Sequence, residues 1–256
     1  MSLASPHSYR GENTVLLAPA HSADRPRDVS ERLGEWCDFF AQGPSEILDL
    51  TIIGRTPQRL FDALSTQVQL RRLRIHQGPF DDLARLDGLN QLVELALESA
   101  TSIRSLEPLR SHPQLVSLEL GNARLIRDYS PLTHLTGLRQ LSLGSPTRAA
   151  SLDFVRSLTE LRHLIWNLVP EDLDYSPLLA LTWVEDMHVS TLRGSRPHLV
   201  DLEWALPGIQ RRKADRVRGV AYAWQDGERI GDYRDTPDGR SGLYRYDIED
   251  FEPWRA

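Results

Sequence analysis

The chain has 256 residues, of which 40% are hydrophobic and 26% charged, and its formal net charge is −6. This length and apolar content suffice to bury a continuous core, and the single cysteine, Cys37, excludes an internal disulfide framework and fits a reducing compartment. The acidic balance disfavours a nucleic-acid surface. The sequence opens without a charged-then-apolar signal pattern and has no apolar run long enough to span a membrane, so we expect a cytoplasmic protein.

Residues 1–27 form an N-terminal segment that we expect to be partly ordered, with one apolar run at residues 14–18 that suits an edge strand. From Asp28, apolar residues at helical spacing predict an amphipathic helix that has Ser30 as its N-cap and stops at Gly43-Pro44. Residues 28–46 directly precede a repeat array. We therefore expect them to form a helical cap, because a terminal repeat otherwise exposes its core.

A repeat with a period of 22 or 23 residues fills residues 47–209, in about seven units. Each unit opens with the pattern L-x-x-L-x-L or an apolar variant of it. The units start at Ile47, Leu70, Leu92, Leu115, Leu138, Leu161 and Val184. The second half of each unit carries apolar residues three apart and twice opens with Ser-Pro-Leu, which suits a short 3₁₀ or α turn. Each unit therefore predicts one strand and one turn.

This period and pattern are the signature of the leucine-rich-repeat family. The units resemble the short bacterial, SDS22-like type, and the segment 128–132, Asp-Tyr-Ser-Pro-Leu, resembles the equivalent stretch of internalins. The resemblance implies a bacterial protein with an α/β fold: a leucine-rich-repeat solenoid, or horseshoe, with a parallel β-sheet on the concave face, a helical N-terminal cap and a small β-rich C-terminal cap.

One position departs from the family pattern. Many such repeats carry asparagine at the ninth position, where its side chain bonds backbone groups of the bend. Here the ninth positions hold Arg55, Gly78, Ala100, Ala123, Pro146 and Val169. Asn122 stands one residue early, so the backbone groups at the bend must be satisfied in another way.

The outward strand positions carry the candidate site. A basic strand at 71–76 lies beside acidic positions at 94–119, and a second basic pair follows at 139–163. Cross-strand pairs such as Arg72 with Glu94 could simply stabilise an empty sheet; the outward Val93 and Val116 favour a binding surface instead. As protein-binding residues we single out Arg72, Arg74, His76, Glu94, Glu98, Glu119, Arg139, Arg162, His163, Ile165 and His188.

After Val189 the period falters, and residues 210–256 predict a β-rich cap. A hairpin turning at Asp226-Gly227 and a third strand at 243–248 account for its pattern. The dense basic run at 211–218 we interpret as a solvated surface of this cap. Seven of the 19 aromatic residues of the chain lie in this part, where they either pack against the last repeat or form a ligand surface.

The sequence contains no phosphate-binding Gly-rich loop, nucleophile elbow or H-E-x-x-H zinc motif. His76, His163 and His188 come from different units and columns, which disfavours a shared metal site. His112 stands in a core column and is predicted to be buried and hydrogen-bonded. Glu94 and Glu98 lie about 13 Å apart along one strand, too far for a paired acid and base, although Glu119 on the next strand could lie between them.

We therefore expect a monomer that is not an enzyme, needs no cofactor or metal, and binds neither nucleic acid nor membrane. The predicted function is non-catalytic binding of an unknown partner protein through the concave face, as a regulator or inhibitor. The acidic net charge suits a basic partner. Two alternatives stay open: an immunity protein that neutralises a bacterial toxin, and ligand binding by the aromatic C-terminal cap.

Overall fold

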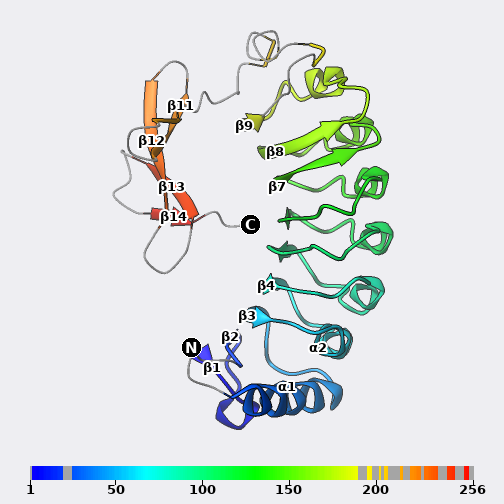
Figure 1. The fold of residues 1–256 in the computed structure, drawn as a ribbon, viewed down its shortest axis with the longest axis vertical. Helices are drawn as coiled ribbons and strands as arrows, with labels where there is room; N and C mark the ends of the chain where they lie inside the picture. The colour runs from blue at the N-terminus through cyan, green and yellow to red at the C-terminus, as the bar shows by residue number, and fades with distance from the viewer. Residues whose placement is uncertain are drawn as a thin grey trace.

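The computed structural model describes residues 2–19, 25–189, 195–197, 202 and 205–206, together with five strands between residues 214 and 253. Its main feature is a nine-stranded sheet whose strands follow one another in chain order and are all parallel (Figure 1). The strands are β1 (Ser2–Leu3), β2 (Thr14–Leu17), β3 (Asp49–Arg55), β4 (Arg72–Gln77), β5 (Glu94–Leu97), β6 (Ser117–Leu120), β7 (Gln140–Ala149), β8 (His163–Pro170) and β9 (Asp186–Val189). The predicted parallel solenoid is confirmed.

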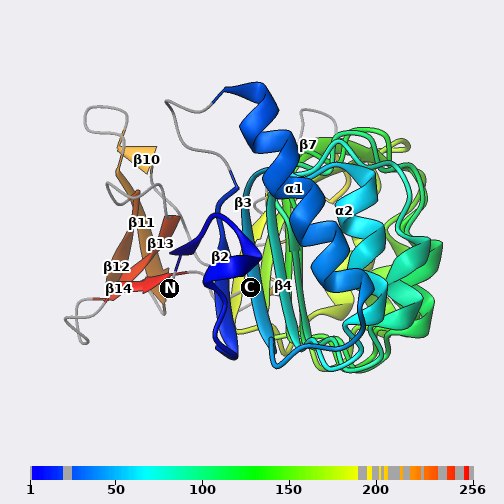
Figure 2. The ribbon, with the colours of Figure 1, turned by 90° about the horizontal axis from the view of Figure 1, so that it is seen from below.

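Short helical turns form the second layer, on the outer side of the arc (Figures 1 and 2). The α-helices whose bounds the structure describes are α1 (Pro26–Ala41) and α2 (Gln58–Ala63). The 3₁₀ turns are η1 (Pro6–Ser8), η2 (Leu64–Thr66), η3 (Ala84–Gly88), η4 (Glu107–Ser111), η5 (Ser130–His134), η6 (Asp153–Ser157) and η7 (Ser176–Ala180). The predicted turn is thus present in the six units that start at Ile47 to Leu161, whereas the second half of the unit that starts at Val184 lies largely outside the described residues. No helix in the described part of the chain is long and apolar enough to cross a membrane.

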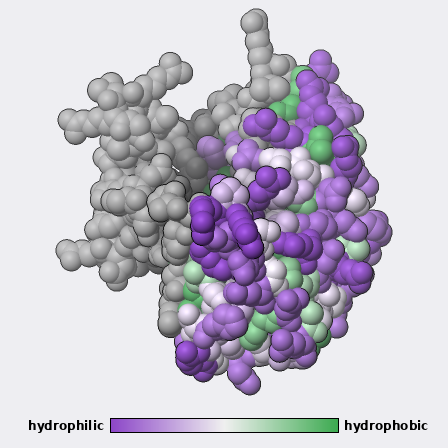
Figure 3. Space-filling model, turned by 60° about the horizontal axis from the view of Figure 1, so that its bottom comes forward, coloured by the Kyte–Doolittle hydropathy of each residue, from purple (hydrophilic) through white to green (hydrophobic). Residues whose placement is uncertain are grey.

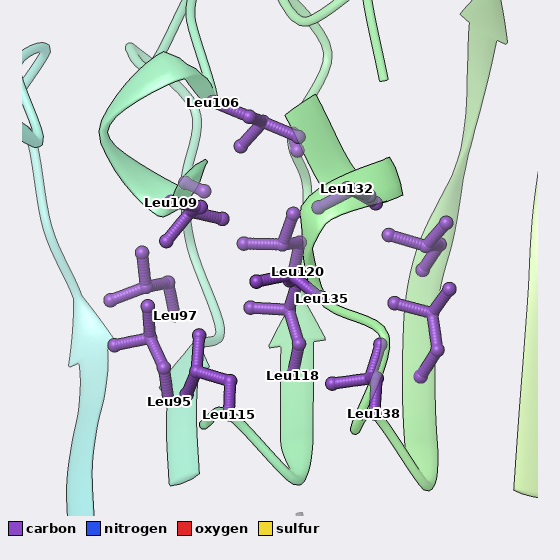
Figure 4. Packing of buried hydrophobic residues seen from close by; sticks show 14 of the residues in the cluster. Leu95, Leu97, Leu106, Leu109, Leu115, Leu118, Leu120, Leu132, Leu135 and Leu138 are labelled. Carbon is purple, nitrogen blue, oxygen red and sulfur yellow. The ribbon is translucent and has the colours of Figure 1, made fainter. Parts of the chain in front are cut away.

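The core consists of leucine columns between these two layers (Figure 4). In β6, Leu118 and Leu120 are buried, and Leu118 stands in register with Leu95 on one side and Leu141 on the other. Across the units, the same columns continue through the 3₁₀ turns, where Leu109 and Leu132 are fully buried. Each unit therefore buries its apolar face only by stacking on its neighbours.

A column of capping residues, which the sequence analysis missed, opens the turns. Asp82, Ser105, Asp128, Ser151 and Asp174 occupy the same position in five successive units. In each case the side-chain oxygen accepts a hydrogen bond from the backbone N–H two residues further on, at 2.7–3.1 Å. This local bond favours a turn over continued strand, so it marks where each unit changes direction.

Other groups replace the asparagine ladder at the bend. Asn122 adopts a left-handed φ of 55° and its Nδ2 lies 3.5 Å from the carbonyl oxygen of Glu98, in the preceding unit. Asn167 donates to the carbonyl oxygen of Gly144 at 3.2 Å. Backbone bonds between units supply the rest, as where the Ala100 N–H donates to the Gly121 carbonyl at 2.8 Å.

The sheet extends further toward the N-terminus than predicted. The apolar run at residues 14–18 forms β2, which is an inner strand, because β1 pairs with it and becomes the edge. The sheet therefore has two strands more than the seven that the repeats predict. The signal was weak because β1 contains only two residues.

The N-terminal helix differs from the prediction at its start. It begins at Pro26 rather than Asp28, and Ser30 lies inside it instead of capping it. Proline suits the first helical position because its missing N–H would have no partner there. Trp36 and Phe40 of α1 are fully buried against the first repeat, and Trp36 Nε1 donates to the Ala4 carbonyl at 3.2 Å.

Two polar residues occupy leucine positions of the core. Gln67 is buried and donates to the carbonyls of Phe40, at 3.2 Å, and Gly43, at 2.7 Å, which ties the end of α1 to the first unit. His112, predicted to be buried and hydrogen-bonded, is so: its Nε2 lies 2.9 Å from the Leu86 carbonyl oxygen. Both side chains thus satisfy backbone groups that would otherwise be unpaired in the core.

A separate antiparallel sheet follows in the C-terminal part. Its strands are β10 (Ala214–Asp215), β11 (Val220–Gln225), β12 (Glu228–Asp235), β13 (Ser241–Arg245) and β14 (Phe251–Pro253). The predicted hairpin is confirmed, since β11 pairs with β12 up to Gln225 and Glu228. The side chains of the predicted aromatic surface, and most of the basic run at 211–218, lie outside the described residues.

Candidate functional site

The outward side chains of β3 to β8, together with the residue before each strand, form what we call the concave face. Successive side chains of a strand point to opposite sides of the sheet, so the leucines enter the core and the residues between them face outward. Parallel register then stacks equivalent residues across the units: Arg74, Ala96, Glu119 and Ser142 stand in one row. The inner side of the arc carries this face (Figure 1).

Arg72 forms the first ion-pair group of the concave face. Its Nη1 lies 3.0 Å from Asp49 Oδ2 on β3, and its Nε lies 3.0 Å from Glu94 Oε1 on β5. The predicted pairing of Arg72 with Glu94 is therefore confirmed. The hydrogen bond that Arg72 donates to Glu94 raises the pKa of Arg72. Because the Arg72 side chain is about half exposed, this group contributes little to stability.

Arg74 organises a second group, which we call the Arg74 cluster: Arg74, His76, Glu98 and Glu119. Arg74 Nη1 lies 2.9 Å from Glu98 Oε1 and 3.3 Å from Glu119 Oε2. His76 Nδ1 lies 3.0 Å from the other carboxylate oxygen of Glu98. Four predicted site residues thus meet at one point of the face: two from β4, one from β6 and Glu98, which directly follows β5.

The residue beneath Arg74 explains how it reaches two strands away. Ala96 of β5 stands in register between Arg74 of β4 and Glu119 of β6. Although it stands at an outward position between two leucines of its strand, it is only 3% exposed. The Arg74 side chain crosses the row at this point, since it bonds to Glu98 directly after β5 and to Glu119 on β6, and the methyl group of Ala96 leaves it room to do so. Ser117, which also stands at an outward position, is 2% exposed.

The two carboxylates of the cluster differ in their affinity for a proton. Burial opposes ionisation of Glu98, but the hydrogen bonds from His76 and Arg74 outweigh it and lower the pKa of Glu98. Burial raises the pKa of Glu119; Arg74 counteracts this, but the charge of Glu98 adds to it. The guanidinium of Arg74 therefore contacts two carboxylates, and its positive charge offsets the negative charge of Glu119 only in part.

Gly121, which the sequence analysis did not single out for a role, allows the backbone to pass close to Glu98. A Cβ atom at Gly121 would lie 2.2 Å from the carbonyl oxygen of Glu98. The Gly121 N–H also donates to the Leu97 carbonyl at 2.8 Å, so β5 and β6 are held together beside the cluster. The signal in the sequence was a glycine at the seventh position, where the three preceding units carry Ile53, His76 and Glu98.

The remaining predicted site residues stay apart from the Arg74 cluster. Arg139 is exposed and forms no ion pair with any residue that the structure describes. The ion pairs of Arg162 are long, 3.6 Å to Glu185 and 3.7 Å to Glu160, and its Nη1 donates to the Leu161 carbonyl at 3.1 Å. His163, Ile165 and His188 are half-buried on β8 and β9, where Ile165 and His188 stand in register.

Among the described residues, no group of three or more histidine, cysteine, aspartate or glutamate side chains is arranged to hold a metal ion. Cys37, on α1, is half-buried, and burial raises the pKa of its thiol. The arrangement on the concave face is one of ion pairs and hydrogen bonds. Chemically, it can recognise charged and hydrogen-bonding groups of another molecule.

Comparison with known proteins shows a likeness to solved structures but not to any family model. No family model matches the sequence, and no curated protein matches it. Among solved structures, internalin C2 of Listeria monocytogenes superposes with a TM-score of 0.51 at 21% identity, over 64% of this chain and 69% of that one. Internalin F of the same organism gives a TM-score of 0.43 at 18% identity, over 76% of this chain and 56% of that one.

Because its sequence identity is low, the likeness to internalin C2 shows the fold alone. Internalin C2 shares the parallel sheet of short strands that alternate with 3₁₀ turns. The chain therefore folds as a leucine-rich-repeat protein, and the predicted resemblance to internalins is confirmed at the level of architecture.

Proposed function

We propose that this protein binds a partner protein through the concave face, without catalysis, and acts as a regulator or inhibitor of that partner. The observation that carries the proposal is the Arg74 cluster, in which two carboxylates on an open face share a single guanidinium. Leucine-rich-repeat solenoids commonly use such extended concave surfaces for binding.

The cluster favours a partner that brings a basic side chain. Glu98 and Glu119 lie close enough to contact the same atom of Arg74, so their charges repel each other, and burial adds a further cost for Glu119. A lysine or arginine from a partner would compensate the carboxylate that Arg74 serves less well. The net charge of −6 would also attract a basic partner over longer distances.

The next strands of the face offer space and some apolar surface. Ser142 and Gly144 on β7 are small, while Val116 before β6 is 37% exposed and Ile165 on β8 is half-buried. Strands lie about 4.8 Å apart, so β3 to β8 span roughly 24 Å. That width is compatible with a standard protein interface of about 800 Å² on each partner.

The proposal is tested by reversing the charges of the cluster with Arg74→Glu and Glu119→Arg in one variant. The exchange keeps opposite charges on β4 and β6 and keeps a positive group beside Glu98, so the fold should persist with an unchanged melting temperature. A matched control exchanges the surface pair on η4, Glu107→Arg with Arg110→Glu, whose side chains lie 2.8 Å apart on the outer side of the solenoid.

The measurement is affinity capture from a lysate of the source organism, followed by mass spectrometry. We expect a protein that the wild type and the η4 control capture and the cluster variant does not. Its identity would also distinguish a general regulator from an immunity protein, since the latter would capture a toxin. Equal capture by all three proteins would place the binding surface elsewhere. A cytoplasmic location and a monomeric state belong to the same proposal and can be checked by fractionation and by light scattering.

A further inference from the structure

A second charged surface lies on the flank of the solenoid, where the chain leaves β5, β6 and β7 towards the 3₁₀ turns. We call it the arginine patch; it consists of Arg104, Arg124, Leu125, Arg127 and Arg148. All five side chains are exposed, and Leu125, at 39%, is among the large apolar residues that the described surface exposes most. Arg104, Arg124, Leu125 and Arg127 follow their strands, and Arg148 lies near the end of β7, beyond its leucines. The patch is therefore separate from the part of the concave face that holds the Arg74 cluster.

The repeat places these side chains beside one another. Arg104 and Arg127 occupy the same position of consecutive units, as do Leu125 and Arg148. Backbone bonds join the units here: the Ala150 N–H donates to the Arg127 carbonyl at 2.9 Å. Equivalent residues of neighbouring units are therefore separated by about one strand spacing, roughly 5 Å.

Among the described residues, no carboxylate oxygen lies within 4.0 Å of a side-chain nitrogen of the four arginines. Asp128 is the next residue after Arg127, but its Oδ1 accepts the Ser130 N–H at 2.8 Å and so caps η5. Arg72 and Arg74 on the concave face, by contrast, contact carboxylates at about 3 Å. Like charges side by side destabilise a sheet. The patch therefore concentrates positive charge on a chain whose net charge is −6.

Acidic residues bound the patch on both sides. Asp82 in the preceding unit caps η3 through the Ala84 N–H at 2.7 Å, and Asp172 in the following unit accepts the Asp174 N–H at 3.0 Å. Their carboxylates are thus occupied by turns rather than by the arginines. The positive surface is confined to the three units that start at Leu92, Leu115 and Leu138.

We propose that the arginine patch docks an acidic polypeptide segment of a partner protein, with an apolar side chain of that segment against Leu125. The charges are complementary, and guanidinium groups bind carboxylates through paired hydrogen bonds. A nucleic acid fits less well, because none of the five side chains is aromatic and the centre of the patch is aliphatic, whereas single strands are held by stacking on aromatic rings. This surface goes beyond the proposed function of the concave face.

The test uses the full chain and a short fluorescein-labelled peptide of aspartate, glutamate and serine around one central leucine, with binding followed by fluorescence anisotropy. We expect saturable binding at about 50 mM salt that weakens at least roughly tenfold at about 300 mM, because exposed charges are screened. Replacing the central leucine of the peptide by serine should weaken binding further, by about threefold to tenfold, if Leu125 makes the apolar contact.

Protein variants locate the site. Arg104→Glu with Arg127→Glu should lower the affinity by at least about tenfold. The control variant Arg27→Glu with Arg85→Glu changes the net charge by the same amount, on exposed residues of α1 and η3, and should bind the peptide nearly as the wild type does. The Arg74→Glu with Glu119→Arg variant should also bind it nearly as the wild type does. Absence of binding, or an equal loss in patch and control variants, would overturn the proposal. So would tighter binding of oligothymidylate of equal charge, which would indicate a nucleic-acid surface.

Discussion

Gly121 and Gly144 offer a matched pair of substitutions, because both occupy the seventh position of their units, in consecutive repeats. A Cβ atom added to Gly121 would lie 2.2 Å from the carbonyl oxygen of Glu98 and 2.8 Å from its carbonyl carbon. A Cβ atom added to Gly144 would meet nothing within 4 Å. Gly121→Ala and Gly144→Ala therefore add the same methyl group at equivalent positions with opposite steric consequences.

The destabilisation expected for Gly121→Ala depends on how far the backbone around Gly121 can shift. Real Cβ atoms do not approach other atoms within 3.0 Å, so the backbone around Gly121 must shift by several tenths of an ångström or more. Hydrogen bonds of 2.8 Å on both sides, from its N–H to Leu97 and from Ala100 to its carbonyl, oppose that shift. We expect Gly121→Ala to cost about 1–3 kcal/mol, as overpacking does, and Gly144→Ala to be neutral or to stabilise by up to about 1 kcal/mol.

Thermal unfolding followed by circular dichroism measures the difference. For a domain of this size, 1 kcal/mol corresponds to a shift of roughly 2–4 °C in melting temperature, so Gly121→Ala should melt at least about 2 °C below the wild type. Gly144→Ala should melt at or slightly above the wild-type temperature. Equal shifts for the two variants would refute the close approach of β5 and β6 at Glu98, and with it the geometry of the Arg74 cluster.

Three further predictions concern the core and the charged cluster. Leu118→Ala should destabilise the fold by roughly 2–5 kcal/mol because it leaves a cavity between buried leucines. Val116→Ala nearby should cost less than about 0.5 kcal/mol, because Val116 is exposed. Equal melting temperatures of the two variants would mean that the register is wrong. His112→Ala should cost about 1–3 kcal/mol beyond the cavity, because it leaves a buried carbonyl without a partner, and unfolding in urea would reveal the loss. Glu98 has a folded pKa below its ordinary 4.5, so its ionised form stabilises the fold at neutral pH. This contribution is lost as the pH falls from 4.5 through the lower folded pKa. Glu98→Gln should therefore destabilise the fold at pH 7 and have little effect in acid. Glu119 has a folded pKa above 4.5, so its ionisation costs stability at neutral pH; Glu119→Gln should stabilise at pH 7, with a gain that fades as the pH is lowered and Glu119 itself becomes protonated. Melting curves from pH 7 to pH 3 would contradict this assignment if the two variants changed in the same direction.

The repeat made the fold readable without a structure. Each unit packs only on its neighbours, so a local pattern such as Leu115, Leu118 and Leu120 already states which side chains enter the core. The burial of His112 followed from the same columns, because a polar side chain in a leucine position must find a partner inside. The pairing of Arg72 with Glu94 followed from the period, which places equivalent residues on adjacent strands.

Features with a weak local pattern were predicted poorly. The two-residue β1 has no periodicity to detect, and Pro26 at the helix start was overlooked in favour of Ser30 as a cap. The column of Asp and Ser residues that caps the 3₁₀ turns was visible in the sequence, since Asp128 and Asp174 stand directly before an apolar residue at equal positions.

The sequence by itself determined the solenoid, its register and the side of the sheet on which each residue lies, because these depend on a period that the chain repeats. Only the tertiary structure decided how outward side chains interact. Arg74 reaches Glu119, 45 residues along the chain, across a buried Ala96, and the passage of Gly121 beside the Glu98 carbonyl holds the neighbouring backbone close. Such contacts depend on side-chain length and on the bulk of the residues between, which periodicity does not encode.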